Sequence, residues 1–448
     1  MARRRLPRHD RAGDLMRRAL DYGRAPPPAA PLAYLLTAPW FGVAAGLVAA
    51  WQGAAVFASR WNPATLAVVH LVTLGFLTMA MTGSLLQMVP AVTGLPPRGT
   101  RRAAAWSCPL LGAGGALLAA AFLSGRPRLF ALAAALLACA FVPVLAWLLP
   151  TLWQRGARAA AGAADIAGGM RGACAALAAC VAAGLALAGW LAGGLAVPVV
   201  PLVDVHAALG LAGWVTALVL AVSFQVIPMF QATDPFPAAV ARGAVPVLLL
   251  ALAGWLAGRW LDAGWRQLPA LAGALVVTAY AGAAAVLLLR RARTRGAAGT
   301  DYWLLSLASL TGAAWLFAWP GAAPDVRPVL AGVCFLAGFA MSAVNGMLYR
   351  IVPFILWYHL RRHARAGDPV PKIADIVEPW RMRAQCRWHA AAVAAALGAC
   401  AVAPLAPAAG VLLAAASLRL GLDLAAPVLR HRHALGLFCK AACPVRRG

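Results

Sequence analysis

The sequence predicts an all-α membrane protein whose roughly twelve transmembrane helices form three pseudo-symmetric four-helix arcs. Three observations favour this fold class. Hydrophobic residues fill 63% of the 448 positions and charged residues only 12%, whereas a soluble chain carries roughly a quarter charged residues. The apolar residues come in stretches of about twenty or more, which is the length that crosses a bilayer as a helix. A Gly-to-Pro pattern also recurs at three places, four predicted helices apart.

The predicted helices follow the apolar stretches in order. Ala, Leu and Gly outnumber β-branched residues, and the roughly ten-residue alternating segments of a β-barrel are absent from the sequence. Because lipid offers no partners for open backbone groups, helices are the remaining way to cross the membrane. We place them at residues 32–58, 65–92, 103–124, 127–150, 172–196, 201–231, 239–259, 268–290, 300–319, 327–360, 386–405 and 407–429.

The positive charges predict the orientation. A net charge of +26 invites a nucleic-acid interpretation, but 31 of the 39 Lys and Arg fall in the two tails and in the loops on the side of the N-terminus. This is the positive-inside bias, so both termini are predicted to be cytoplasmic in a bacterial inner membrane, with lipid rather than nucleic acid as the partner. The eight exceptions are Arg350 and Arg419 within helices and six arginines in the opposite loops, namely Arg60, Arg126, Arg128, Arg259, Arg266 and Arg327.

The same boundaries divide the chain into parts. A basic tail over residues 1–31 precedes arcs over 32–150, 172–291 and 300–429, and a second basic tail covers 430–448. We expect the three arcs to form one integral membrane domain, because no stretch between them is long enough for a soluble domain.

Three of the predicted helices, the second, sixth and tenth, share one pattern. Each pairs a glycine with a proline fifteen residues later, at Gly75–Pro90, Gly213–Pro228 and Gly338–Pro353. The glycines let neighbouring helices approach closely, and the prolines stand near the cytoplasmic helix ends, where a missing N–H donor costs little. We interpret the pattern as a threefold repeat; the alternative is that membrane helices simply share these residues.

This arrangement resembles subunit I of the heme-copper oxidases. The segments Thr82–Pro90 (TGSLLQMVP) and Val344–Pro353 (VNGMLYRIVP) look like the ends of the second and tenth helices of that family. The chain also resembles the NnrS family of heme- and copper-containing membrane proteins associated with nitric oxide resistance. The resemblance implies heme b and copper as cofactors and respiratory-chain or cytochrome proteins as partners.

His70 matches the axial heme ligand in the second helix of the oxidases. It lies twenty residues before Pro90, near the predicted outer end of its helix. The His-x-His pair of the oxidase tenth helix is replaced here by Ala331 and Val333, and the histidines and tyrosine of the copper centre have no counterpart. The resemblance therefore predicts a degenerate, non-oxidase member without a catalytic residue for oxygen reduction.

His206 is the second candidate ligand, for heme or for a metal ion. It lies twenty-two residues before Pro228, so it is displaced from the position of His70 by about 3 Å along the helix and by roughly 200° around it. It would present another face unless the register shifts. A simple outer-surface histidine is the alternative. Asp204 can orient its ring or cap the helix.

The remaining candidates lie toward the predicted cytoplasmic side. His359 and His363 are one turn apart and can chelate a metal ion, and His389 is a further candidate; the alternative is an interfacial belt. Gln87, Gln225 and Arg350 occupy one repeat position and can bind a heme propionate or hydrogen-bond the helix ends together. Of the thirteen acidic residues, only Asp423 falls within a predicted helix away from its start, which disfavours a proton pump or a carboxylate-based antiporter.

The leading hypothesis is a heme- and/or copper-binding membrane protein that serves nitric oxide resistance, electron transfer or respiratory cofactor handling. One rival is a cofactor-free permease that uses the repeat interface as a path for its substrate. The other is a structural or assembly subunit of a respiratory complex. An absorption spectrum of the purified protein separates the first from the other two.

Overall fold

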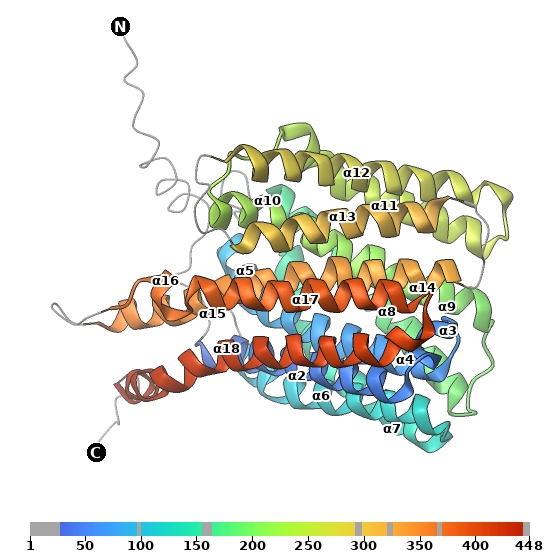
Figure 1. Ribbon diagram of the computed structural model, residues 1–448, viewed down its shortest axis with the longest axis horizontal. Helices are drawn as coiled ribbons and strands as arrows, with labels where there is room; N and C mark the ends of the chain where they lie inside the picture. The colour runs from blue at the N-terminus through green and yellow to red at the C-terminus, as the bar shows by residue number, and fades with distance from the viewer. Residues whose placement is uncertain are drawn as a thin grey trace, which may run out of the picture.

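The computed structural model describes residues 27–95, 100–154, 164–291, 298–319, 326–364 and 370–441. All regular structure in these ranges is helical, and the long helices run side by side as one bundle (Figure 1). Ten helices of the described part are long and apolar enough to cross a membrane. The chain is thus a multi-pass α-helical membrane protein in contact with lipid.

The described residues form nine continuous long helices and three composite ones. The continuous helices are α2 (Ala29–Gln52), α6 (Thr100–Ser124), α7 (Pro127–Trp153), α8 (Ala164–Leu191), α11 (Ala238–Trp260), α12 (Gln267–Arg290), α13 (Ala298–Ala318), α17 (Pro379–Ala399) and α18 (Ala406–Ala441). The short elements are α3 (Ala55–Ala58), η4 (Gly264–Arg266), α16 (Ile373–Ile376) and η6 (Ala403–Leu405).

Each composite helix consists of an α segment, a π-helical segment and a second α segment. The first is α4 (Pro63–His70), η2 (Leu71–Thr78) and α5 (Met79–Thr93). The second is α9 (Val199–Ala208), η3 (Leu209–Thr216) and α10 (Ala217–Gln231). The third is α14 (Val326–Val333), η5 (Cys334–Met341) and α15 (Ser342–His363).

Several predicted helix boundaries differ from the structure: α8 begins at Ala164 rather than at residue 172, and α17 spans Pro379–Ala399 rather than 386–405. The helix expected over 32–58 stops at Gln52, because Gly53 adopts a positive φ of 56° that only glycine takes readily. The last helix was expected to end at residue 429 but continues to Ala441. Pro353 also lies well inside α15, which runs on to His363.

The π-helical segments coincide with the Gly-to-Pro pattern of the sequence. Each is eight residues long, has the pattern glycine at its fifth position, and ends twelve residues before the proline: Gly75 in η2, Gly213 in η3 and Gly338 in η5. A π-helical turn is rare and is found mostly at functional sites. Its recurrence at one position in three helices is far more specific than the residue pattern alone.

The three glycines also make equivalent contacts with the preceding continuous helix. A Cβ atom at Gly75 would overlap the Phe41 ring of α2. A Cβ atom at Gly213 would lie 2.6 Å from Cβ of Ala176 in α8, and one at Gly338 would lie 2.6 Å from Cβ of Ser309 in α13. Since Phe41, Ala176 and Ser309 project into the space that a side chain would need, only glycine allows each pair of helices this close.

The first and last long helices pack directly against each other. Gly46 of α2 faces the backbone of Ala414 in α18, and Gly410 of α18 faces the backbone of Ala50 in α2. α2 begins and α18 ends at the same end of the bundle, which we call the near end (Figure 1). The end that carries α3 and the start of α9 is called the far end.

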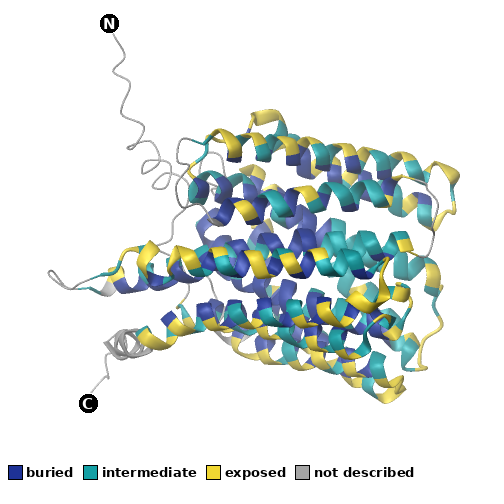
Figure 2. Cartoon of the chain, viewed as in Figure 1, coloured by how far each residue is buried: buried dark blue, intermediate teal, exposed yellow. Residues whose placement is uncertain are grey.

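The two halves of the bundle differ in packing density. Toward the near end the interior is dominated by fully buried side chains, whereas toward the far end many interior residues keep accessible surface (Figure 2). Leu85, Val89 and Val352 of the near half are at most 1% exposed, while His206 in α9 is only half-buried. The far half therefore contains internal space.

Candidate functional site

A cavity of about 1290 Å³ occupies the far half of the bundle. It extends from the middle of the three composite helices to the far-end turns at Gly125, Asp262 and Arg327. Apolar side chains form most of its wall. Ligand sites in proteins usually measure roughly 300–1,000 Å³ and combine an apolar wall with a few polar groups, so this cavity has the size and lining of a ligand site.

Equivalent positions of the three composite helices line this cavity. Counted back from the pattern proline, the residues at twelve, twenty and twenty-two positions line it in all three helices. Twelve residues before the proline stand Thr78, Thr216 and Met341. Twenty residues before it stand His70, Ala208 and Val333, and twenty-two before it stand Val68, His206 and Ala331. The three composite helices therefore contribute equivalent positions to the wall of the cavity.

His70 is the last residue of α4, immediately before the π-helical segment. Its Nδ1 lies 2.7 Å from the carbonyl oxygen of Leu66, one turn earlier in the same helix. Because a carbonyl only accepts hydrogen bonds, Nδ1 must carry the hydrogen, and the neutral ring keeps its lone pair on Nε2. The Phe122 ring of α6 packs beside the imidazole with a centroid distance of 5.1 Å.

His206 lies in α9, on the second composite helix. Its Nδ1 is 3.0 Å from the carbonyl oxygen of Cys180 in α8, so this ring also keeps its lone pair on Nε2. The Cys180 thiol is 3.5 Å from the same nitrogen and lines the cavity as well. A Cβ at Gly184 would come within 2.9 Å of the imidazole. α8 thus holds the ring through the Cys180 carbonyl and packs against it at Gly184.

The two imidazoles face the same space from different helices. Their centroids are 6.3 Å apart and their planes differ by 12°. The structure thus brings together the two strongest sequence candidates, although counting residues along one helix placed them on different faces. In both rings, main-chain carbonyls fix Nδ1 and leave Nε2 without its proton. This is the form in which histidine binds metals.

Arginines surround the far end of the cavity. The two carboxylate oxygens of Asp204 accept hydrogen bonds from Arg60 Nη1 and Arg259 Nε, both at 2.7 Å. Arg266 pairs with Asp262 at 3.1 Å, and Arg327 donates to the Trp319 carbonyl at 2.6 Å. All four arginines and both aspartates line the cavity, so its far end carries two positive charges in excess.

Asp204 serves neither of the roles expected from the sequence. The N-cap of α9 is Pro198, without a side-chain cap, and the Asp204 carboxylate bonds the two arginines rather than the neighbouring imidazole. Through them it connects the α3–α4 turn, α9 and α11. Sequence reasoning identified Arg60 and Arg259 only as loop charges and did not connect them with Asp204, because nothing local signals a partner in another helix.

Of the other histidine candidates, His359 and His389 are not among the residues that line this cavity. His389 of α17 is 1% exposed; its Nε2 is 2.9 Å from the Ser342 hydroxyl and 3.1 Å from the Ala337 carbonyl. His359 is buried in α15, seventeen residues beyond Ser342, which is roughly 25 Å along the helix. The His363 side chain lies outside the described residues. Within the described part, no three His, Cys, Asp or Glu side chains are grouped to hold a metal ion.

The predicted propionate-binding residues lie in the near half of the bundle. Gln87 is 8% exposed and lines a second, smaller pocket. Gln225 and Arg350 are half-buried, and neither lines the histidine cavity or this pocket among the described residues. The structure therefore separates this group from His70 and His206.

Comparison with known proteins gives no family for this chain. No model of a protein family matches the sequence, and no curated protein matches it either. Its chemistry must be inferred from the site itself.

Proposed function

We propose that this protein binds heme between His70 and His206 and acts as a membrane-embedded electron carrier. The observation that carries the proposal is the geometry of the two rings. Imidazole nitrogens bind metals at about 2.0–2.1 Å, so two imidazoles on opposite sides of one ion have centroids roughly 6 Å apart. The rings of His70 and His206 have this spacing, at 6.3 Å, and both have a free Nε2.

Volume and charge favour heme over a bare copper ion. Two nitrogen ligands and an ion need little space, whereas the cavity measures about 1290 Å³. Heme b combines a broad apolar ring with two carboxylates. The apolar wall suits the ring, and the two excess positive charges at the far end suit the carboxylates. We therefore propose propionate contacts at Arg60, Arg259, Arg266 and Arg327 rather than at Gln87, Gln225 and Arg350.

The carbonyls, the apolar wall and the arginines of the cavity each have a role in this proposal. Bound heme supplies a one-electron couple. The Leu66 and Cys180 carbonyls hold the imidazoles in the ligating tautomer. The apolar wall excludes water, and the arginines fix the orientation. With both imidazoles engaged in holding the heme, electron transfer would be favoured over catalysis.

The proposal includes the architecture and the relationship that the sequence suggested. Three related four-helix units, starting at α2, α8 and α13, would give twelve spans when α13 and α17 are counted with the ten apolar helices. The equivalent π-helical segments and glycine contacts support this repeat. Kinship with heme-copper oxidase subunit I, and with NnrS-like proteins, follows from the same repeat.

The proposed orientation places the near end in the cytoplasm of a bacterial cell. Most Lys and Arg, including those of the two tails, are at that end by sequence. The histidine cavity would then open toward the periplasm, where electron-transfer partners of the respiratory chain would dock. Cysteine-accessibility labelling of Gly125→Cys and Asp234→Cys in intact cells tests this; only the first should react with an impermeant reagent.

Absorption spectroscopy of the purified full-length protein tests the function. We expect a Soret band and, after reduction, the sharp visible bands of a low-spin heme with two imidazole ligands. His70→Ala and His206→Ala should each abolish the low-spin spectrum. His389→Gln is the matched control, because this buried histidine lies in another helix and bonds only Ser342 and Ala337; its spectrum should be unchanged.

Two results would overturn the proposal. Stoichiometric copper without a Soret band would assign the histidines to a metal ion instead. A protein without heme or copper when isolated from heme-sufficient cells, and unable to take up added heme, would leave the cavity to a transported or structural ligand.

A further inference from the structure

Two arginines in the near half of the bundle lie close together without an acidic partner among the described residues. Arg291 directly follows the last residue of α12, and Arg350 is the ninth residue of α15. The two guanidinium groups are close enough for the charge of Arg291 to act on Arg350. No ion pair in the described part of the chain involves either one. Asp301, in the first turn of α13, is exposed and acts on Cys386 of α17.

The Arg350 guanidinium is only partly accessible to water. The side chain is half-buried, and its Nε atom is buried without a hydrogen-bond partner among the described residues. A guanidinium group stays protonated in proteins and has only donors, so this burial leaves it in need of an acceptor. Arg350 stands thirteen residues before the end of α15, and the negative charge of a helix C-terminus is confined to the last turn. An anion is therefore the partner that this position requires.

The end of α10 holds Arg291 in place with an uncharged side chain. Oε1 of Gln231 accepts hydrogen bonds from Arg291 Nη1 at 3.1 Å and from the Thr300 hydroxyl of α13 at 3.2 Å. Gln231 is 5% exposed and Thr300 is 7% exposed, so both contacts lie inside the protein. Because the Gln231 amide is neutral, it positions the Arg291 guanidinium but does not neutralise its charge.

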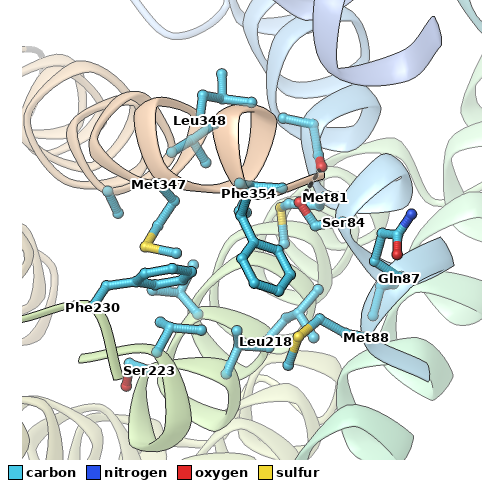
Figure 3. A pocket seen from close by; sticks show the side chains of 18 of the residues that line it. Met81, Ser84, Gln87, Met88, Leu218, Ser223, Phe230, Met347, Leu348 and Phe354 are labelled. Carbon is cyan, nitrogen blue, oxygen red and sulfur yellow. Dashed lines mark hydrogen bonds between the residues drawn. The ribbon is translucent and has the colours of Figure 1, made fainter. Parts of the chain in front are cut away.

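Two aromatic residues bring Arg350 to the same end of α10. Phe230 precedes Gln231 in the chain, and Phe354 stands one turn after Arg350, on the same face of α15. The two phenyl rings pack with a centroid distance of 6.4 Å, and both line the small apolar pocket of the near half (Figure 3). Gln231 and Arg350 do not line that pocket. The polar cluster is therefore a neighbour of the apolar pocket and separate from it.

A phosphate group has the charge and the shape that this cluster can hold. Arginine presents its donors in a planar fork that matches two phosphate oxygens, and one phosphate has enough oxygens to bridge two forks. A phosphate monoester carries roughly −1.5 to −2 charges at pH 7, which offsets Arg291 and Arg350 together. A neutral ligand would leave both charges uncompensated, and a cation would be repelled.

We propose that Arg291 and Arg350 form a binding site for a phosphate group, with Gln231 and Thr300 holding Arg291 in position. The bound group would connect the ends of α10 and α12 with α13 and α15, because these helices supply or adjoin the cluster. Inorganic phosphate and the headgroup of an anionic phospholipid both offer this chemistry. Binding at this site does not rest on the proposed heme.

Thermal unfolding of the full-length protein in dodecyl maltoside, a detergent without phosphate, tests the site. Inorganic phosphate should raise the unfolding temperature above the value in chloride of equal ionic strength, because a ligand of the folded state stabilises it. Phosphatidylglycerol is the second probe, for the lipid headgroup. Arg291→Gln and Arg350→Gln should each lower the affinity for the effective probe by about tenfold or more, since each removes charge-assisted hydrogen bonds.

Gln231→Glu supplies the missing negative charge from the chain itself. The two side chains have nearly the same shape, and the new carboxylate would replace the amide oxygen that lies 3.1 Å from Arg291 Nη1. Without ligand, this variant should unfold at a higher temperature than the wild type, and its affinity for the probe should fall by about tenfold or more. It keeps the test usable if an arginine variant fails to fold.

Arg290→Gln is the matched control for the arginine variants. Arg290 is exposed beside Arg291 in the chain, so this variant removes the same charge from the surface and should bind the probe as the wild type does. Weakening by Arg290→Gln as large as that by Arg350→Gln would reduce the effect to general charge attraction and overturn the site.

The two probes distinguish the source of the phosphate group. Stabilisation by inorganic phosphate assigns the site to the free anion, and stabilisation by phosphatidylglycerol alone assigns it to a headgroup. Phosphorus that copurifies with the wild type but not with Arg350→Gln supports the site as well. The proposal fails if the purified protein contains no phosphorus and neither probe shifts its unfolding temperature. No readout uses heme absorption, so this failure is distinguishable from a missing heme spectrum.

Discussion

The His70 and His206 rings lie 6.3 Å apart and within 12° of parallel although they occupy different positions of the repeat. The residue equivalent to His70 in the second composite helix is Ala208, and the third helix has Val333 there. A threefold arrangement with identical ligands would place three imidazoles around the axis. The displacement by two residues instead brings two imidazoles, from two different helices, to within 6.3 Å of each other.

Replacing His206 with methionine should change the redox potential of the proposed heme without removing it. Methionine is a weaker donor than imidazole, and His/Met ligation raises the potential. We expect a rise on the order of 0.1 V, within the roughly 0.8 V that axial ligands span. Spectroelectrochemical titration measures it. Cys180→Ala leaves the carbonyl that bonds His206 in place, so a comparable shift in that variant would contradict the assignment.

Asp204→Asn should destabilise the far end of the bundle more than Arg60→Gln does. The carboxylate is 14% exposed and bonds two guanidinium groups. Removing the shared charge leaves Arg259, itself 19% exposed, without its partner, and breaking a buried pair costs about 3–5 kcal/mol. Arg60 is 42% exposed, so Arg60→Gln should cost about 1 kcal/mol or less. Thermal unfolding in detergent compares them, and equal effects would argue against this ranking.

Gly75→Ala should disrupt the contact between α2 and the first composite helix. The added methyl group would overlap the Phe41 ring, and overpacking typically costs about 1–3 kcal/mol. Phe41→Ala in the same chain should restore much of the loss, because it removes the overlapping atoms. Gly312→Ala is the control, since nothing lies within 4 Å of its Cβ position. A double variant no more stable than Gly75→Ala, measured by thermal unfolding, would show that another contact is responsible.

Asp423→Asn should strongly destabilise the near half. This carboxylate is 5% exposed; it bonds Arg381 at 3.1 Å and accepts from the Tyr349 hydroxyl at 2.8 Å. Asp423→Asn removes the charge that Arg381 and Tyr349 share; because Arg381 is 42% exposed, the cost should lie near the lower end of the roughly 3–5 kcal/mol for breaking a buried pair. Tyr349→Phe removes one hydrogen bond to a charged group and should cost about 1.5–3 kcal/mol. Thermal stability of the two purified variants gives the order, and the reverse order would show that the hydroxyl matters more than the charge.

Much of the fold could be predicted because its signals are local. Apolar stretches indicated the spans, and the Gly-to-Pro pattern identified the three helices that contain π-helical segments. The glycine positions predicted close helix contacts, which the structure shows at Phe41, Ala176 and Ser309. The π-helical turns themselves were not predicted, because no residue type specifies them and packing against neighbouring helices decides where they form.

The candidate site was only partly predictable for a similar reason. His70 and His206 could be selected because an imidazole in a membrane helix needs a partner. Their mutual geometry depends on how two separate helices pack, so residue counting along one helix could not show that both rings reach the same cavity. The Cys180 carbonyl and the arginine pairs of Asp204 are contacts between distant segments, and sequence carries no local signal for them.

The direct contact between α2 and α18 has a consequence for biosynthesis. Gly46 meets the backbone of α18 and Gly410 meets that of α2, so α2 cannot complete this close backbone contact until α18 has been synthesised. This side of the bundle is therefore closed late, after the other described helices have left the ribosome.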